Sequence, residues 1–295
     1  MTQHQIDSDP ANAGERPLAL RAERTDGRLQ IFRPGMDLPL LIQHAGPDWR
    51  PYIHPILAPD GVGALTEDGA GMHHPWQHGL FIGLNDVNGV GFWTEEAGVD
   101  GTFHPQPLAQ PKLDGQSVQW LVGSEWRSPG GIPLVEETQA WRFHDQGAEF
   151  VLDLDWTLRG LVDLVFGQYA YGGLYLRSSY RPNTGARVLN SEGQVNLDVD
   201  GQRARWAAVE LPIVGRETCQ ETVCSIAILD HPTNPEHPVP WRTDRHVGLA
   251  PSRCIAGAWT LARGESTRSR YRLLIRCGPA DRSRIDAAWG IFAGE

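Results

Sequence analysis

Alternation of apolar and polar residues is the main pattern along this chain of 295 residues. In the segment 148–156, AEFVLDLDW, apolar side chains occupy every second position and carboxylates fall between several of them. The segments 118–126 and 269–277 repeat the same period of two. Successive side chains of a β-strand point to opposite faces, so this period predicts strands that are buried on one face.

Shorter apolar segments bounded by turn residues predict further strands, at 18–22, 29–33, 40–42, 79–84, 132–143 and 223–229. One helix is predicted, at 281–293. Asp281 can cap its N-terminus, and Ile285, Ala288, Trp289 and Phe292 follow at helical spacing. With 33 glycines and 22 prolines, no repeat and no clear linker, the chain favours short connections within one unit. We therefore predict an all-β protein: a disordered tail at 1–16, then a single large antiparallel β-sandwich at 17–295 with one C-terminal helix.

Charge and composition exclude several classes of function. A net charge of −10, dispersed along the chain, argues against a nucleic-acid partner. The chain has no apolar run long enough to span a membrane, and its first residues lack the pattern of a secretory signal. Four cysteines without CxxC spacing are expected to be reduced thiols, although a Cys219–Cys224 bridge stays open. We expect a cytoplasmic protein, and the oligomeric state stays open.

Two histidine-proline loops concentrate the candidate chemistry. The first, MHHPWQHGLFIGLNDVNGVGFWT at 72–94, contains His74 and His78, and the second, DHPTNPEHPVPW at 230–241, contains His231 and His237. Proline restricts the preceding residue to an extended conformation, which stiffens the backbone that carries the imidazole. We predict that the two loops form one site together with His54, which also precedes a proline.

Imidazole groups in this number suit two kinds of site. A divalent ion (Zn, Ni, Cu, Fe or Mn) favours imidazole ligands, and the tentative set is His54, His74 and His78. Alternatively, the histidines hydrogen-bond a ligand or transfer protons, and a purely structural role also stays open. No organic cofactor is evident.

Other side chains around the loops are candidates for binding a small, sugar-like substrate. Trp76, Trp93 and Trp241 could stack on a flat ring, although core packing is the alternative for each. Amide or guanidinium groups could bind hydroxyls, and these are Asn85, Asn88, Arg177 and Asn234. Glu136 and Glu137 fall on opposite faces of one predicted strand, so at most one can be catalytic. We favour Glu136, whose face is less apolar.

Several motifs together resemble a known family. They are YIHPILAPDG (52–61), the segment 73–95, YGGLYLR (171–177), LNSEG (189–193) and LDHPTNPEHPVPW (229–241). From about residue 17 onward the chain resembles the uncharacterised bacterial family labelled "methane oxygenase PmoA-like". That label fits poorly, because a particulate methane monooxygenase subunit is an integral membrane protein. The resemblance instead implies a galactose-mutarotase-like supersandwich and carbohydrate metabolism. Many members have Asp-His-Pro where this chain has His73-His74-Pro75, so His74 matches and His73 departs.

The leading functional hypothesis is an enzyme acting on a sugar or a sugar-derived small molecule. The reaction would be that of a lyase, hydrolase or isomerase, with the five histidines as metal ligands or acid/base groups. The second hypothesis is a metal-free mutarotase or epimerase with a histidine acid and Glu136 as base. The third is a non-catalytic carbohydrate-binding protein. A copper oxygenase is the least favoured.

Overall fold

The long alternating segments form the centre of a nine-stranded antiparallel sheet. A computed structural model describes residues 19–47, 49–70 and 74–295, and every strand count refers to those residues. In sheet order the strands are β10 (Lys112–Asp114), β11 (Ser117–Arg127), β12 (Pro133–Asp145), β13 (Glu149–Gly160), β22 (Ser266–Cys277), β18 (Val223–Asp230), β17 (Trp206–Pro212) and β16 (Arg187–Asn190), with β9 (Thr102–Pro105) paired to β11.

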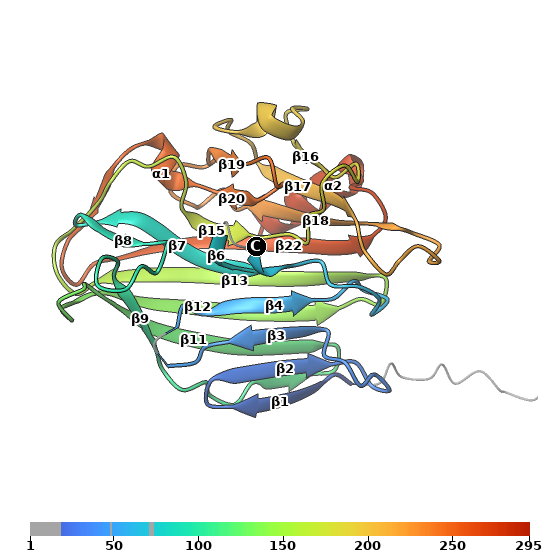
Figure 1. Ribbon diagram of the computed structural model, residues 1–295, viewed down its shortest axis with the longest axis horizontal. Coiled ribbons are helices and arrows are strands. Elements are labelled where there is room, and N and C mark those ends of the chain that lie inside the picture. The colour runs from blue at the N-terminus through green and yellow to red at the C-terminus, as the bar shows by residue number, and fades with distance from the viewer. Residues whose placement is uncertain (1–18, 48, 71–73) are drawn as a thin grey trace, which may run out of the picture.

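A second, eleven-stranded sheet is stacked on the first (Figure 1). Its main order is β1 (Arg21–Thr25), β2 (Arg28–Phe32), β3 (Leu41–His44), β4 (Tyr52–Ile56), β7 (Leu80–Val87), β15 (Gly173–Leu176), β20 (Leu249–Pro251) and β19 (Trp241–Thr243). Three short strands complete it: β8 (Val90–Phe92), β14 (Leu164–Phe166) and β21 (Trp259–Leu261). A separate hairpin joins β5 (Asp68–Ala70) to β6 (His74–His78).

The main hydrophobic core lies between the two sheets. Alternation turns Phe143 and Phe150 of the nine-stranded sheet inward, against residues such as Ile53, Ile82 and Leu174 of the other sheet. Burial of these side chains from both inner faces holds a β-sandwich together. The all-β sandwich predicted from the sequence is therefore confirmed.

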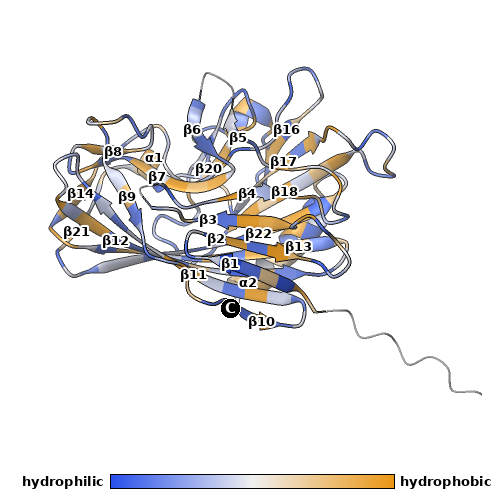
Figure 2. Ribbon diagram, turned by 60° about the horizontal axis from the view of Figure 1, so that its bottom comes forward, coloured by the Kyte–Doolittle hydropathy of each residue, from blue (hydrophilic) through white to orange (hydrophobic). Residues whose placement is uncertain are grey.

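Helix α2 (Arg282–Ala293) covers the outer face of the nine-stranded sheet. Asp281 caps it as predicted, accepting a hydrogen bond of 3.1 Å from the backbone N–H of Arg284. Ile285 and Phe292 are buried against Trp206 and Leu229. Figure 2 shows the hairpin of β5 and β6 on the opposite side of the sandwich from α2. The two long faces of the molecule are thus covered by different elements.

Two further short helices were not predicted. They are a 3-10 turn, Asn196–Val199, and a single turn, α1 (Arg253–Ala256). None of the helices formed by the described residues is long and apolar enough to cross a membrane. The predicted tail at 1–16 lies outside the described residues, as do residues 17 and 18, so the division into tail and domain stays a prediction.

Candidate functional site

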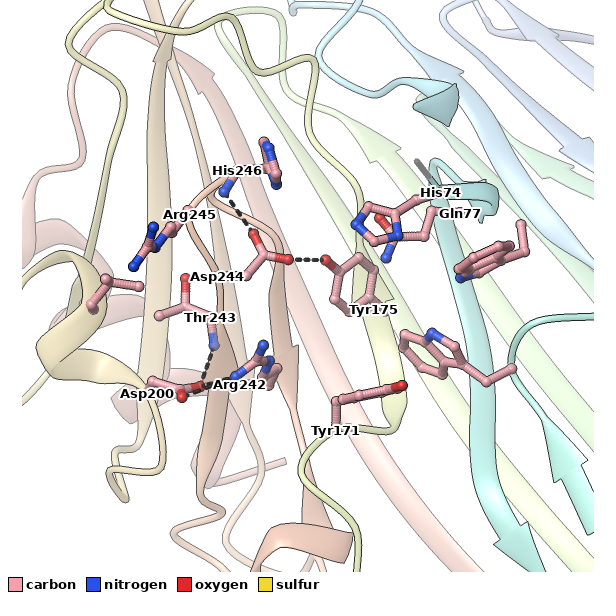
Figure 3. A pocket seen from close by; sticks show the side chains of 13 residues that line it. His74, Gln77, Tyr171, Tyr175, Asp200, Arg242, Thr243, Asp244, Arg245 and His246 are labelled. Carbon is pink, nitrogen blue, oxygen red and sulfur yellow. Dashed lines mark hydrogen bonds and ion pairs between the residues drawn. The ribbon is translucent and has the colours of Figure 1, made fainter. Parts of the chain in front are cut away.

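A cavity of about 430 Å³ opens between β6 and β19, on the outer face of the eleven-stranded sheet (Figure 3). One wall consists of residues 74, 76 and 77 from β6, together with Trp93, Tyr171 and Tyr175. The opposite wall consists of residues 242–246, with Leu197 and Asp200 beside them. The first histidine-proline loop therefore meets the segment that directly follows the second loop.

Aromatic rings form most of the first wall. Trp93 is buried and packs against three neighbours, with ring centroids 5.2 Å from Phe81, 4.9 Å from Tyr171 and 5.3 Å from Tyr175. Trp76 is partly buried against the same rings. Such packing fixes the orientation of the indoles, which leaves a rigid apolar surface for a flat ligand face.

Two aspartates hold the opposite wall in place. Asp200 accepts hydrogen bonds from the Arg242 guanidinium, at 3.0 and 3.1 Å, and from the backbone N–H of Thr243, at 3.0 Å. Asp244 accepts from the backbone N–H groups of His246 and Gly248 and from the Tyr175 hydroxyl, the last at 2.9 Å. Both carboxylates are thus already used in fixing the loop.

The electrostatics of Asp244 follow from these contacts. Burial would raise the pKa of its carboxyl, but the two backbone N–H groups and the Tyr175 hydroxyl outweigh burial and lower that pKa overall. The carboxylate therefore stays ionised, which keeps Tyr175 and the 244–248 turn in register.

Two imidazoles face each other across the cavity. The ring centroids of His74 and His246 are 6.3 Å apart, with an angle of 74° between the rings. His74 also contacts the edge of Trp76 at 5.6 Å, and His246 lies 5.6 Å from the Tyr180 ring. Figure 3 shows both imidazoles directed into the space between the walls. A ligand in the cavity could contact both imidazoles, which lie next to each other.

His78 lies outside the cavity, within a chain of charged groups. Its Nδ1 is 2.5 Å from Asp68 Oδ1 and its Nε2 is 3.5 Å from Glu95 Oε2, while Glu95 Oε1 is 3.0 Å from Arg50 Nε. Burial lowers the pKa of the His78 imidazole, but the two carboxylates outweigh burial and raise it overall. This arrangement favours a protonated His78 that holds two carboxylates together.

His54 belongs to a second cavity, of about 310 Å³, which Glu67, Asp68 and Arg181 also line. The Nδ1 atom of His54 lies 3.0 Å from the Thr66 hydroxyl. Burial lowers the pKa of this imidazole. His54 and His78 thus both lie near Asp68, whereas His74 lines the other cavity.

The predicted metal set does not fit this geometry. Across residues 19–47, 49–70 and 74–295, no three His, Cys, Asp or Glu side chains are grouped closely enough to hold an ion. A structural or catalytic metal site needs at least three protein ligands converging on one point. His54, His74 and His78 do not converge, and we derive no step through a metal. His73 lies outside the described residues.

The second histidine-proline loop is built around a buried carboxylate. Asp230 is fully buried and accepts from Asn234 Nδ2 at 2.7 Å, from the backbone N–H of Val239 at 3.0 Å, and from His237, whose Nδ1 is 2.7 Å away. The His237 ring is stacked on Trp289 of α2, with the centroids 6.1 Å apart. These contacts attach α2 to the sheet.

His231 takes part in the same packing. Its Nε2 accepts from Arg270 at 2.8 Å, and its ring meets the edge of Phe292. The expectation that both loops and His54 share one site is therefore corrected. His231, Asn234 and His237 lie with α2, because the loop satisfies its own polar groups on Asp230 instead of reaching the cavity.

Glu136 also lies away from the cavity. It is exposed on the outer face of the nine-stranded sheet, where its Oε2 accepts from Arg159 at 3.0 Å. Glu137 points the other way and is buried, accepting from Trp126, Gln139 and Trp156 at 2.9–3.0 Å. Alternation thus separated the two side chains correctly, but Glu136 cannot reach a ligand between β6 and β19.

The remaining candidates divide between structural positions and the cavity margin. Trp241 is fully buried and donates to the Ala204 carbonyl at 2.8 Å, so it belongs to the core. Asn88 bridges the Asp163 carbonyl and the Val165 N–H, and Asn85 donates to the Tyr171 carbonyl at 3.4 Å. Arg177 is buried behind the cavity, 3.6 Å from Glu67. Trp76 and Trp93 line the cavity as expected.

Sequence reasoning missed the wall opposite β6. Its residues Arg242, Asp244 and His246 occur in WRTDRH, which immediately follows the second histidine-proline loop. Charged groups and a histidine at every second position after a buried tryptophan were the available signal. Tyr171 and Tyr175 lie within the YGGLYLR motif but were not singled out.

The fold and this lateral cavity define an all-β sandwich protein with a cavity on one outer face. The chain belongs to a family of unknown function, DUF6807, whose model matches residues 43–290. The expectation of an uncharacterised family is thus confirmed, but the description does not support the methane oxygenase label. No curated protein matches the chain.

Several solved structures are distantly similar to this chain. An α-galactosidase from Lactobacillus brevis is 11% identical over 88% of this chain, with a TM-score of 0.39. The chain spans only 40% of the length of that enzyme. A galactose mutarotase related enzyme from Lactobacillus acidophilus is 9% identical, with a TM-score of 0.36, covering 87% of this chain and 97% of the other.

Proposed function

We propose that this protein is an enzyme that acts on a sugar or a sugar-derived small molecule bound between β6 and β19. The observation that carries this proposal is one cavity that combines an aromatic wall with two facing histidines, His74 and His246. A volume of about 430 Å³ suits a small ligand. Sugars bind to such sites by placing the apolar face of the ring on an indole while their hydroxyls meet polar groups.

His74 and His246 are the proposed proton-transfer groups. Imidazole titrates near neutral pH, so one ring can accept a proton while the other donates one. Isomerisation, elimination and hydrolysis of sugars can each use a general acid together with a general base. Asp200 and Asp244 are held by the loop that they stabilise, so we assign them to positioning.

The proposal predicts which histidine substitutions abolish turnover. General acid–base catalysis contributes about 10²- to 10⁴-fold, so His74→Gln and His246→Gln should each lower kcat by at least about 100-fold. His104→Gln is the matched control, because His104 lies beside Thr102 on β9 and is not among the residues that line the cavity. Turnover would be followed by mass spectrometry and NMR on a panel of aldoses, ketoses and sugar acids. Unchanged kcat in both cavity variants would refute the proposed roles.

The aromatic wall also supports a second candidate, a non-catalytic carbohydrate-binding protein. Trp93 is held rigidly by three aromatic neighbours, which is the feature that a lectin-like site needs. The two candidates differ in one measurement. A sugar that raises the melting temperature but yields no product in the same panel would favour the binding protein.

A further inference from the structure

Gln77 has an unusual position in the wall of the cavity. The residue is only 5% exposed, and its Oε1 atom accepts no hydrogen bond from any of the described residues. Figure 3 shows its amide beside the His74 ring, above Tyr175. An amide oxygen can only accept hydrogen bonds, and a buried acceptor without a donor destabilises the protein. This oxygen therefore needs a donor, and the cavity is where a ligand could supply one.

The neighbouring Tyr175 hydroxyl cannot supply this donor. It has a single proton and donates it to Asp244 Oδ2 at 2.9 Å. Burial and the adjacent carboxylate raise the pKa of Tyr175 well above its usual range, so the hydroxyl keeps that proton. A ligand group facing Gln77 and Asp244 therefore meets two acceptor oxygens.

Arginine side chains at and behind the cavity are held by carboxylates of the protein. Arg242 is paired with Asp200, with Nη1 3.0 Å from Oδ2, and Arg177 lies 3.6 Å from Glu67 behind the wall. Arg245 is exposed at the rim. The inner guanidinium that lines the cavity, that of Arg242, is thus already paired, and a carboxylate ligand at Gln77 and Asp244 would place a third acceptor against their oxygens. A hydroxyl can donate to either acceptor at no electrostatic cost.

We infer that Gln77 is a specificity-determining residue, whose Oε1 accepts a hydrogen bond from a hydroxyl of a neutral sugar. The cavity then prefers a neutral sugar to the uronate of the same ring. This inference rests on the proposed function, because it concerns the ligand of the same cavity. It identifies the substrate class as uncharged and rich in hydroxyls.

The test compares binding of defined probes by isothermal titration calorimetry. The probes are D-glucose and D-galactose, their uronates, and the monodeoxy analogues of whichever neutral sugar binds. We expect a neutral sugar to bind at least about tenfold more tightly than its uronate. Gln77→Met should weaken the neutral sugar about five- to tenfold. Gln77→Glu keeps an acceptor oxygen and should retain most of the affinity for the neutral sugar.

The monodeoxy analogues identify the hydroxyl that Gln77 binds. One analogue should bind wild-type protein about five- to tenfold more weakly than the parent sugar, and this difference should disappear in Gln77→Met. Gln168→Met, at an exposed residue that donates to the Ile255 carbonyl, is the control and should change nothing. Circular dichroism shows that each variant is folded, and if Gln77→Met does not fold, the affinities of the wild type for the neutral sugar and its uronate still decide whether the cavity prefers an uncharged ligand.

Each failure has a distinct meaning. A uronate that binds more tightly than its neutral counterpart would overturn the inference while leaving the proposed function intact. Equal affinity of wild type and Gln77→Met for the neutral sugar would remove Gln77 as the determinant. If no sugar and no uronate binds, the proposed function fails together with the inference.

Discussion

Gly248 has no side chain, and the Tyr175 hydroxyl occupies the space that a β-carbon would fill there. A β-carbon built on Gly248 would overlap this hydroxyl, and it would lie 2.6 Å from Tyr175 Cζ and 3.0 Å from Asp244 Oδ2. The backbone N–H of Gly248 also donates to Asp244 Oδ1 at 3.1 Å. Gly248→Ala must therefore displace the tyrosine ring and weaken the hydrogen bond between Tyr175 and Asp244.

Three contributions set the size of this effect. Overpacking a well-packed site costs about 1–3 kcal/mol. A lost hydrogen bond to an ionised group adds about 1.5–3 kcal/mol. Alanine in place of glycine restricts the unfolded chain, which offsets about 0.4–1 kcal/mol. We expect Gly248→Ala to lower the free energy of unfolding by about 3 kcal/mol, and to weaken ligand binding because Tyr175 lines the cavity.

A double-mutant cycle with Tyr175→Phe isolates the cause. Phenylalanine lacks the overlapping oxygen but retains Cζ, so it relieves the clash in part. The double variant should be less destabilised than the sum of the single variants, by at least about 1 kcal/mol in urea denaturation. Gly46→Ala is the control, because an added β-carbon there meets nothing within 4 Å. A strictly additive cycle would refute the account of Gly248.

Three further predictions concern buried charged groups. Burial lowers the pKa of His78 but its two carboxylate partners raise it overall. Its contribution to stability is therefore complete below the unfolded-state pKa of about 6.5 and is lost as pH rises through the folded-state pKa. The free energy of unfolding should fall less steeply with pH above pH ~6.5 in His78→Gln than in the wild type, and equal slopes would contradict this. Glu137→Leu leaves three buried donors without their acceptor and should lower the free energy of unfolding by about 3–5 kcal/mol. Glu136→Gln should change it by no more than about 0.5 kcal/mol, and chemical denaturation of both variants measures the difference. Asp230→Asn should lower the free energy of unfolding by about 2–4 kcal/mol and increase hydrogen exchange in α2, and unchanged protection of α2 would argue against its anchoring role.

The strands could be predicted because their periodicity is local. Each of the long segments 118–126, 148–156 and 269–277 became part of a strand in the nine-stranded sheet. Alternation also placed Glu136 and Glu137 on opposite faces. It could not show which face carries a ligand site, because a solvent-exposed face and a site face are both polar.

The meeting of distant segments could not be predicted in the same way. Both histidine-proline loops have the composition of a functional site, yet only the first lines the cavity. In the second loop, the Asp230 carboxylate accepts hydrogen bonds from His237 and Asn234, which are only a few residues away, so these two side chains already have partners within the loop. The amino-acid composition of a loop shows that it contains histidines, but it cannot distinguish a histidine that binds a ligand from one that stabilises a turn.

The burial of Trp241 nevertheless indicates where the wall missed by the sequence prediction lies. Its indole is fully buried, so Arg242, the next residue of β19, is expected to point to the outer face before the strand ends at Thr243. Thr243 is buried like Trp241 and Arg242 is paired with Asp200, whereas Asp244, in the segment after β19, is hydrogen-bonded to Tyr175 in Figure 3. Assigning Trp241 to the core, instead of to a binding wall, would have placed Arg242 on the outer face, with the polar segment 244–246 directly after it. The buried Trp241 thus indicates the site, because it fixes Arg242 on the outer face, next to the segment that contains Asp244 and His246.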